Sequence, residues 1–228
     1  MSRKRHQQRH PVNETQRANF IQIIPKTDKQ RDLLKALDEY QQVFISGNAG
    51  TGKTYVATTH ACREFLYGRA KRIIITRPAV AACVENLGFL PGSLQSKVAP
   101  WAMPVTSVIE EHLGKAQTQE ALRNGSIEIV PFGYLRGRSF KDCYILLDEA
   151  QNTTREQMEL ILTRIGEGSR IVVSGDLKQS DIGKQSGLQH AMELVEKYRI
   201  PAGVIRFTKE DCVRSALCKL WVEAYDSN

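Results

Sequence analysis

The sequence has few of the features that mark secreted, metal-binding or membrane proteins. It has five cysteines in 228 residues, an odd number, and none of them form close pairs: Cys62, Cys83, Cys143, Cys212 and Cys218. A structural zinc site or a disulfide framework would need such pairs, so we expect small buried thiols in a reducing compartment. No signal peptide is visible, and the longest apolar runs have the length of a strand, too short to cross a bilayer. These absences predict a cytoplasmic protein without a membrane segment.

The first ten residues lack any acidic side chain. They carry Arg3, Lys4, Arg5 and Arg9, which supply more than half of the formal net charge of +7. We expect residues 1–24 to be a basic, disordered leader and residues 25–228 to form one domain. Such a leader attracts RNA or other single-stranded nucleic acid by releasing counterions, and a passive solvated tail is the alternative.

The stretch from residue 47 to residue 54 carries the most specific chemical pattern. An apolar run at 43–45 precedes it and a helix-compatible run beginning at Tyr55 follows it, the setting of a phosphate-binding loop. Backbone N–H groups of such a loop and the following helix N-terminus bind the phosphates of ATP. Lys53 is expected to reach the β- and γ-phosphates, and the Thr54 hydroxyl to bind Mg²⁺. The predicted nucleotide-binding residues are Gly47, Asn48, Ala49, Gly50, Thr51, Gly52, Lys53 and Thr54.

Two adjacent acids follow the apolar run 143–147. In an open α/β sheet, ligands lie beyond the carboxyl ends of the strands, which would place Asp148 beside the Mg²⁺ bound by Thr54. Glu149 could then orient and deprotonate the attacking water. The alternative is that both acids only stabilise the N-terminal end of a following helix by interacting with its dipole.

Two glutamines are further candidates for the nucleotide site. Gln30 stands a short way upstream of the loop, where it could recognise adenine or complete a capping box with Thr27. Gln179 follows the apolar run 170–173 and could sense the γ-phosphate.

Alternation of apolar runs with amphipathic stretches predicts an α/β fold with a parallel sheet and helices on both faces. The expected strands are 43–45, 72–76, 127–130, 143–147, 170–173 and 203–207. Residues 77–125 are long for a connection, so we expect an insertion over the active-site face, with a helical part around 105–113. An apolar stripe formed by Val213, Ala216, Leu217 and Leu220 marks a terminal helix.

Residues 131–138 interleave aromatic side chains with arginine and glycine. Phe132 and Tyr134 could stack on bases while Arg136 and Arg138 meet phosphates. The competing interpretation is a basic surface turn whose two aromatic rings pack inward.

Taken together, the segments 47–54, 88–92, 136–138, 148–152, 175–181 and 211–214 resemble the PhoH family of P-loop ATPases. The resemblance covers nearly all of the chain from Thr27. It implies a P-loop NTPase fold with a RecA-like core related to superfamily 1 helicases, and ATP hydrolysis linked to RNA. It also assigns Asp148 and Glu149 to the metal and the water, and Gln179 to sensing of the γ-phosphate.

The leading hypothesis is a homo-oligomeric ATPase, a hexameric ring by resemblance, that works on RNA. Since no second motor domain is visible, a neighbouring chain would supply the arginine that stabilises the transferring phosphoryl group, with Arg164 and Arg214 as candidates. A small-molecule kinase and a nucleotide-gated adaptor with negligible turnover are the alternatives.

Overall fold

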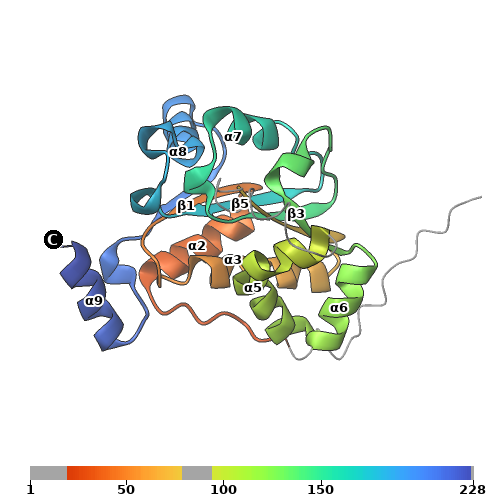
Figure 1. Ribbon diagram of the computed structural model, residues 1–228, viewed down its shortest axis with the longest axis horizontal. Coiled ribbons are helices and arrows are strands. Elements are labelled where there is room, and N and C mark those ends of the chain that lie inside the picture. Colours follow the sequence, from red (N-terminus) through yellow and green to blue (C-terminus); the bar gives the residue numbers. More distant parts are fainter. Residues whose placement is uncertain (1–19, 79–93, 227–228) are drawn as a thin grey trace, which may run out of the picture.

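A six-stranded parallel sheet forms the centre of the protein. The computed structural model describes residues 20–78 and 94–226, with the strands in the order β3-β2-β4-β5-β1-β6 (Figure 1). Their bounds are β1 Gln42–Ser46, β2 Arg72–Arg77, β3 Ile127–Pro131, β4 Cys143–Leu147, β5 Arg170–Gly175 and β6 Gly203–Arg206. The predicted fold class is therefore confirmed: a P-loop type of α/β fold with a parallel sheet and helices on both faces.

The register of the sheet brings several strand ends to one level. Ser46 pairs with Gly175 across β1 and β5, and Thr76 pairs with Leu147 across β2 and β4. The segments that leave β1, β2, β4 and β5 consequently start side by side at the carboxyl edge of the sheet, where ligands bind in this kind of fold.

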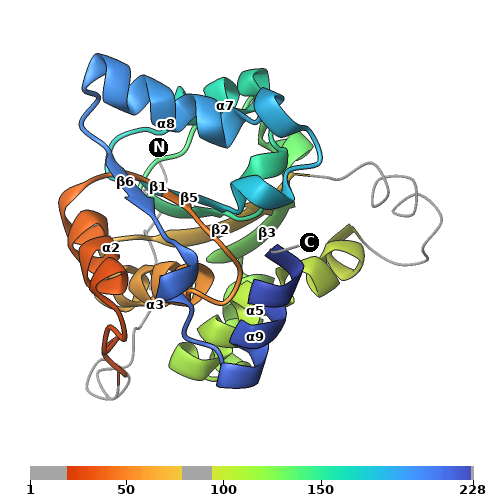
Figure 2. The ribbon, with the colours of Figure 1, turned by 90° about the vertical axis from the view of Figure 1, so that its left-hand side faces the viewer.

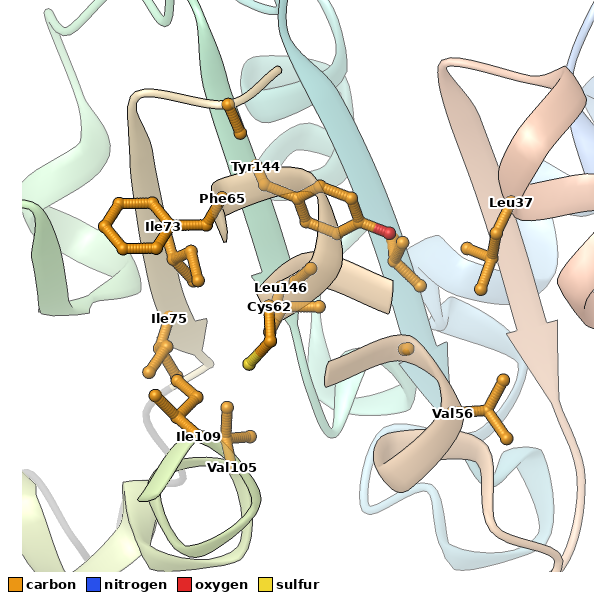
Figure 3. Close-up of a cluster of buried hydrophobic side chains, with 14 of the residues drawn as sticks. Leu37, Val56, Cys62, Phe65, Ile73, Ile75, Val105, Ile109, Tyr144 and Leu146 are labelled. Atoms are coloured by element: carbon orange, nitrogen blue, oxygen red, sulfur yellow. The ribbon is translucent and has the colours of Figure 1, made fainter. Parts of the chain in front are cut away.

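Helices cover both faces because the central strands are apolar on both sides. On one face, α2 (Asp28–Glu39), α3 (Lys53–Leu66), α5 (Leu94–Leu113) and α6 (Lys115–Arg123) enclose a core with Ile73, Ile75 and Leu146 (Figure 3). On the other face, α7 (Arg155–Leu162), α8 (Gly187–Tyr198) and the short 3₁₀ helix η1 (Phe132–Leu135) cover a second core (Figure 1).

From Leu94 onward, the long segment after β2 forms a layer of the fold, in contrast to the expected insertion over the active-site face. Where the structure describes it, α5 packs on α3 and on the sheet, burying Ala102, Val105 and Ile109 in the first core. The apolar spacing of α5 therefore serves the core, and within residues 94–125 only Pro104 lines the nucleotide cleft. The segment 88–92, and Cys83, lie outside the described residues.

The amino-terminal boundary lies earlier than predicted. Phe20 and Ile23 pack against the first core, and the Phe20 ring lies 5.1 Å from that of His112. The domain thus begins no later than Phe20, and the cationic residues 3–9 lie outside the described residues. Thr27 caps α2 by accepting a hydrogen bond from the Gln30 N–H, as predicted.

The terminal helix α9 (Ala216–Asp226) forms, but its apolar stripe does not enter a core. Leu217, Leu220 and Trp221 are 67%, 62% and 60% exposed. The helix α9 lies to one side of α2 and α5 in Figure 1 and in front of α5 in Figure 2, so it stands apart from the helices that cover the sheet. Spacing of three and four residues places these three side chains on one face of the helix. No helix among the described residues is both long and apolar enough to cross a membrane.

Of the four cysteines that the structure describes, Cys62, Cys143 and Cys212 are buried and Cys218 is half-buried. All four are free thiols. The expectation of small buried side chains is confirmed for the first three.

Candidate functional site

The glycine-rich loop between β1 and α3 curls because three of its glycines adopt positive φ angles. The values are +145° at Gly47, +82° at Gly50 and +83° at Gly52, a region that other residues adopt only with strain. The surroundings also leave no room for a side chain: a Cβ at Gly52 would lie 2.8 Å from Nε2 of Gln30, and one at Gly47 only 2.5 Å from Phe207. The loop is thus shaped by glycine and enclosed by residues distant in the sequence.

Lys53, the first residue of α3, is buried at the base of this loop. Its Nζ donates hydrogen bonds to the carbonyl oxygens of Gly47 (2.5 Å) and Asn48 (2.8 Å). Burial lowers the pKa of Lys53, and the carboxylates of Asp176, Asp148 and Glu149 oppose that shift. The ammonium therefore lies among three acids, and an anion entering the cleft would offer it stronger partners than neutral carbonyl groups.

Gln30 supports the loop from α2. Its Nε2 donates to the carbonyl oxygen of Thr51 at 2.9 Å, and its Oε1 accepts the backbone N–H of Lys26 at 2.8 Å. The capping box predicted with Thr27 is thus only half formed, because the Gln30 side chain accepts the N–H of the residue before the cap. Recognition of adenine by Gln30 stays a prediction and would use the hydrogen-bonding capacity that remains on this amide.

The two acids after β4 lie in different environments. Burial, followed by the neighbouring charge of Glu149, raises the pKa of Asp148. Glu149 has a positive φ of 53°, which is uncommon for a side-chain-bearing residue and typical of functional sites. Its Oε1 lies 3.4 Å from an Arg77 guanidinium nitrogen, and its Oε2 accepts a hydrogen bond from Gln151 at 2.6 Å. Glu149 is therefore restrained from two sides.

Gln151 connects the segment after β4 to the segment after β5. Its side chain is buried, and its Oε1 accepts the backbone N–H of Asp176 at 3.0 Å. Asp176 in turn accepts a hydrogen bond from Nε2 of Gln179 at 3.0 Å. A chain of hydrogen bonds thus joins Glu149 to Gln179, the predicted γ-phosphate sensor.

Arg214 lies in the nucleotide site of its own chain. The Val213 N–H donates to the Gly50 carbonyl oxygen at 3.0 Å, and the Arg214 side chain passes over Gly50. The expectation that Arg214 reaches into a neighbouring chain does not fit this placement, because β6 pairs with β1 and brings the following segment beside the loop. Arg164, the other candidate, does not line the nucleotide cleft. The next residue, Ile165, forms an isolated β-bridge with Phe140, just before β4 begins.

These segments enclose a cleft of about 300 Å³. It is lined by Ala49, Gly50, Gly52, Lys53, Thr54, Tyr55, Arg77, Pro104, Asp148, Glu149, Ser174, Gly175, Asp176, Gln179 and Arg214. Of the predicted site residues, Gln30 lies behind the loop, while Gly47, Asn48 and Thr51 contribute to its backbone. Three participants were not predicted: Arg77, Gln151 and Asp176. The position of Arg77 and Asp176 immediately at strand ends is the sequence signal that could have found those two.

The residues present fit Mg²⁺ bound together with phosphates. Thr54 and Asp148 supply the oxygen ligands that Mg²⁺ prefers, and one or two such protein ligands suffice. Near them, the buried hydroxyls of Thr58 and Ser174 have no hydrogen-bond partner among the described residues, so polar atoms lie unmatched on this side of the cleft. Among residues 20–78 and 94–226, no group of three or more histidine, cysteine or acidic side chains gathers as a separate metal site.

Comparison with known proteins agrees with this geometry. The family model described as PhoH-like protein matches residues 22–226. The chain belongs to the PhoH family. It is 44% identical over 207 residues to Protein PhoH of Escherichia coli (strain K12), covering 89% of this chain and 58% of that protein. It is 42% identical over 214 residues to a PhoH-like protein of Bacillus subtilis, covering 93% of this chain and 66% of the relative. This PhoH-family chain thus spans about 58–66% of the length of these two relatives.

Solved structures give weaker similarities. The ATPase core of a Sulfolobus solfataricus SWI2/SNF2 protein in complex with double-stranded DNA matches with a TM-score of 0.45 and 14% identity, over 83% of this chain and 46% of that one. The Pif1 helicase of Candida albicans matches with a TM-score of 0.38 and 15% identity, over 82% of this chain and 40% of that one. At these scores the matches add nothing on ligands or activity.

Proposed function

We propose that this PhoH-family protein binds and hydrolyses ATP with Mg²⁺, and that a homo-oligomer couples hydrolysis to RNA or another single-stranded nucleic acid. The observation that carries the proposal is the single cleft that gathers Lys53, Thr54, Asp148, Glu149 and Gln179 from three separate segments. Phosphoryl transfer needs positioning and charge stabilisation more than covalent chemistry, and this cleft offers both.

Each residue has a distinct role in the proposed reaction. The curled loop and the N-terminus of α3 bind the phosphates, and Lys53 exchanges its carbonyl partners for β- and γ-phosphate oxygens. Mg²⁺, when bound by Thr54 and Asp148, would neutralise charge on the phosphates. Glu149 orients a water and takes its proton. Arg214, which lies against Gly50 and lines the cleft, supplies positive charge to the transferring phosphoryl group from within the same chain.

The restraint on Glu149 supports a slow basal rate. Gln151 orients one carboxylate oxygen of Glu149 by a hydrogen bond, whereas the Arg77 guanidinium, 3.4 Å from the other oxygen, competes with a water for that oxygen. A partner that draws Arg77 away from Glu149 would free this oxygen for the water and raise turnover. RNA is the partner we propose, and a protein that stays slow with every nucleic acid would instead be the nucleotide-gated adaptor.

The exposed face of α9 supports the oligomer. An isolated 11-residue helix is marginal in water, and its apolar face gains stability only when another surface covers it. A second copy of the chain is the occupant we propose. The helix α9 begins at Ala216, two residues after Arg214, so a copy bound to α9 would lie near the nucleotide site of the chain that carries this helix. We propose a ring of copies, hexameric by family resemblance, with α9 in each interface.

The ATPase rate with and without single-stranded RNA tests the function. We expect Mg²⁺-dependent phosphate release that RNA increases, and no release from Lys53→Ala. Transfer of the γ-phosphate to a small acceptor without release of free phosphate would indicate a kinase instead. For the oligomer, sedimentation should show a ring for the wild type and smaller species for Trp221→Glu. Tyr198→Glu, at an exposed position on α8, is the matched control.

A further inference from the structure

A second cleft lies between η1 and the beginning of α7. Phe132, Gly133, Arg136, Thr154, Glu156, Gln157 and Leu160 line it, and its volume is about 420 Å³. We call it the η1–α7 cleft. It lies outside the nucleotide cleft, with which it shares no lining residue. Because η1 directly follows β3, the cleft adjoins the same carboxyl edge of the sheet at which ATP is proposed to bind.

The two aromatic residues of η1 have opposite environments. Phe132 is 4% exposed and packs in the second core, whereas Tyr134 is 63% exposed. Each of the two sequence interpretations, inward packing and base stacking, therefore fits one of the two rings. Phe132 packs inward and anchors the 3₁₀ helix η1, while the Tyr134 ring remains in solvent. An exposed aromatic ring on a rigid support is a platform on which a base can stack.

The two arginines that follow also differ. Arg138 is paired with Glu128 at 2.7 Å, and its guanidinium lies 5.7 Å from the Phe140 ring centroid, so it serves the fold. Arg136 is exposed, lines the cleft, and makes no ion pair within the described part of the chain. Arg155, the first residue of α7, is exposed as well. Arg136 and Glu156 are the charged residues that line the cleft, and Arg155, next to Glu156 in the sequence, is not part of the lining.

We infer that the η1–α7 cleft and Tyr134 form a binding site for single-stranded nucleic acid. Tyr134 stacks on one base and Arg136 contacts an adjacent phosphate. A duplex does not fit this chemistry, because its bases are stacked on one another and not available to Tyr134. The inference rests on the proposed function and assigns its nucleic-acid site.

The position of the cleft offers a route to the catalytic segment. Thr154, which lines the cleft, caps α7 by accepting the Gln157 N–H at 3.3 Å. The residues between Thr154 and Glu149 are tied together, with Thr153 Oγ1 donating to the Ala150 carbonyl oxygen at 2.6 Å and Gln151 donating to Glu149. A nucleic-acid strand bound against Thr154 would therefore contact the segment that holds Glu149. Through this contact nucleic acid would raise turnover.

Binding of fluorescein-labelled 20-nucleotide oligouridylate to the full chain, followed by anisotropy, tests the site. We expect Tyr134→Ala to weaken binding by about 5- to 150-fold, the range for loss of one base–aromatic stack. Tyr134→Phe should bind as the wild type does. Arg136→Ala should weaken binding and reduce the slope of log affinity against log salt by about 0.7, one phosphate contact on a single strand. Tyr198→Ala is the control, since Tyr198 on α8 is also 63% exposed.

Two further measurements separate the possible failures. Each variant should bind a fluorescent ATP analogue as the wild type does, and Tyr134→Ala should keep its basal ATPase rate while losing stimulation by oligouridylate. If the wild type binds no oligonucleotide, the RNA part of the proposed function fails together with this site. If the wild type binds and Tyr134→Ala binds equally well, only this site is wrong and the surface serves another purpose, such as a protein contact.

Discussion

The side chain of Arg214 lies against Gly50 of its own chain. A Cβ at Gly50 would come within 2.6 Å of both Cδ and Nε of Arg214, so the guanidinium stem occupies the space that any side chain at Gly50 would need. The contact joins the two ends of the domain: the loop after the first strand and the segment after the last. Glycine at position 50 is required both for its φ of +82° and for this close approach.

Gly50→Ala is expected to lower turnover by displacing Arg214. Gly125→Ala is the matched control, because Gly125 has a similar φ of +77° but nothing within 4 Å of the added Cβ. Both variants should lose about 1–2 kcal/mol of unfolding free energy from the left-handed backbone, measured by urea unfolding, but only Gly50→Ala should lose ATPase activity. Adding Arg214→Ala to Gly50→Ala should then change the rate little further. Additive losses would show that Gly50→Ala acts without Arg214.

Arg214→Ala is expected to leave ATP binding intact and to reduce turnover, since its charge acts on the transferring phosphoryl group from within the same site. An arginine in cis makes a specific prediction for mixed oligomers. Mixing Arg214→Ala with Glu149→Gln protein and allowing subunits to exchange should restore no activity, because every site then lacks one of the two groups. Restored activity would return Arg214 to the neighbouring site.

Lys53→Ala and Glu149→Gln are expected to separate binding from chemistry. Lys53 meets the phosphates directly, so Lys53→Ala should lose ATP binding or turnover. Glu149→Gln keeps a similar shape without a base and should bind ATP while slowing hydrolysis by about 10²- to 10⁴-fold. Equilibrium binding and single-turnover hydrolysis measure the two effects. Near-normal hydrolysis by Glu149→Gln would remove Glu149 from the proposed mechanism.

Gln151→Leu is expected to impair both stability and catalysis. It removes the donor to Glu149 and leaves the buried N–H of Asp176 unpaired, which costs about 1–3 kcal/mol of unfolding free energy. Turnover at saturating ATP should fall because Glu149 loses its orientation. Asn152→Ala is the control: that neighbouring amide bonds only with the surface residue Asp181 among the described contacts, so its loss should leave turnover unchanged. Equal effects of the two variants would deny Gln151 a positioning role.

Local patterns in the sequence predicted most of the fold. The β-branched run 72–76, the glycine spacing of 47–54 and the cap at Thr27 each depend on neighbouring residues, and each appears where expected. Periodicity could not tell which apolar stripe finds a partner. The stripe of α8 packs on the sheet through Leu188 and Met192, whereas the equally regular stripe of α9 remains exposed.

The local sequence patterns could not predict contacts between segments that are distant in the sequence. The placement of Arg214 over Gly50 depends on β6 pairing with β1, an outcome of sheet order that no local signal contains. Gln151 has the same difficulty: its partners Glu149 and Asp176 follow different strands, and only the register of β4 and β5 brings those ends together.

His60 is buried in α3 and lines neither the nucleotide cleft nor the η1–α7 cleft. Its Nε2 lies 2.8 Å from a guanidinium nitrogen of Arg63, which can only donate, and 3.3 Å from Oδ1 of Asp38, while its Nδ1 lies 2.8 Å from the Tyr144 hydroxyl. The shorter contact, to Arg63, favours an Nε2 without a proton. This arrangement suits a neutral ring. Burial, followed by the charge of Arg63, lowers the pKa of His60 to about 4, despite Asp38 and Glu64 acting in the opposite direction.

A lowered histidine pKa makes the fold less stable in acid. Between about pH 6.5 and pH 4 the unfolded chain binds the proton and the folded chain does not, so the unfolding free energy contributed by neutral His60 is present above pH 6.5 and falls as pH decreases. From pH 7 to pH 5 the loss should be about 2 kcal/mol, measured by urea unfolding. His112, whose pKa burial also lowers, acts in the same direction, so the comparison that isolates His60 is the His60→Gln variant. It should lose about 2 kcal/mol less than the wild type over this range, and an equal loss in both proteins would mean that His60 does not titrate as this environment requires.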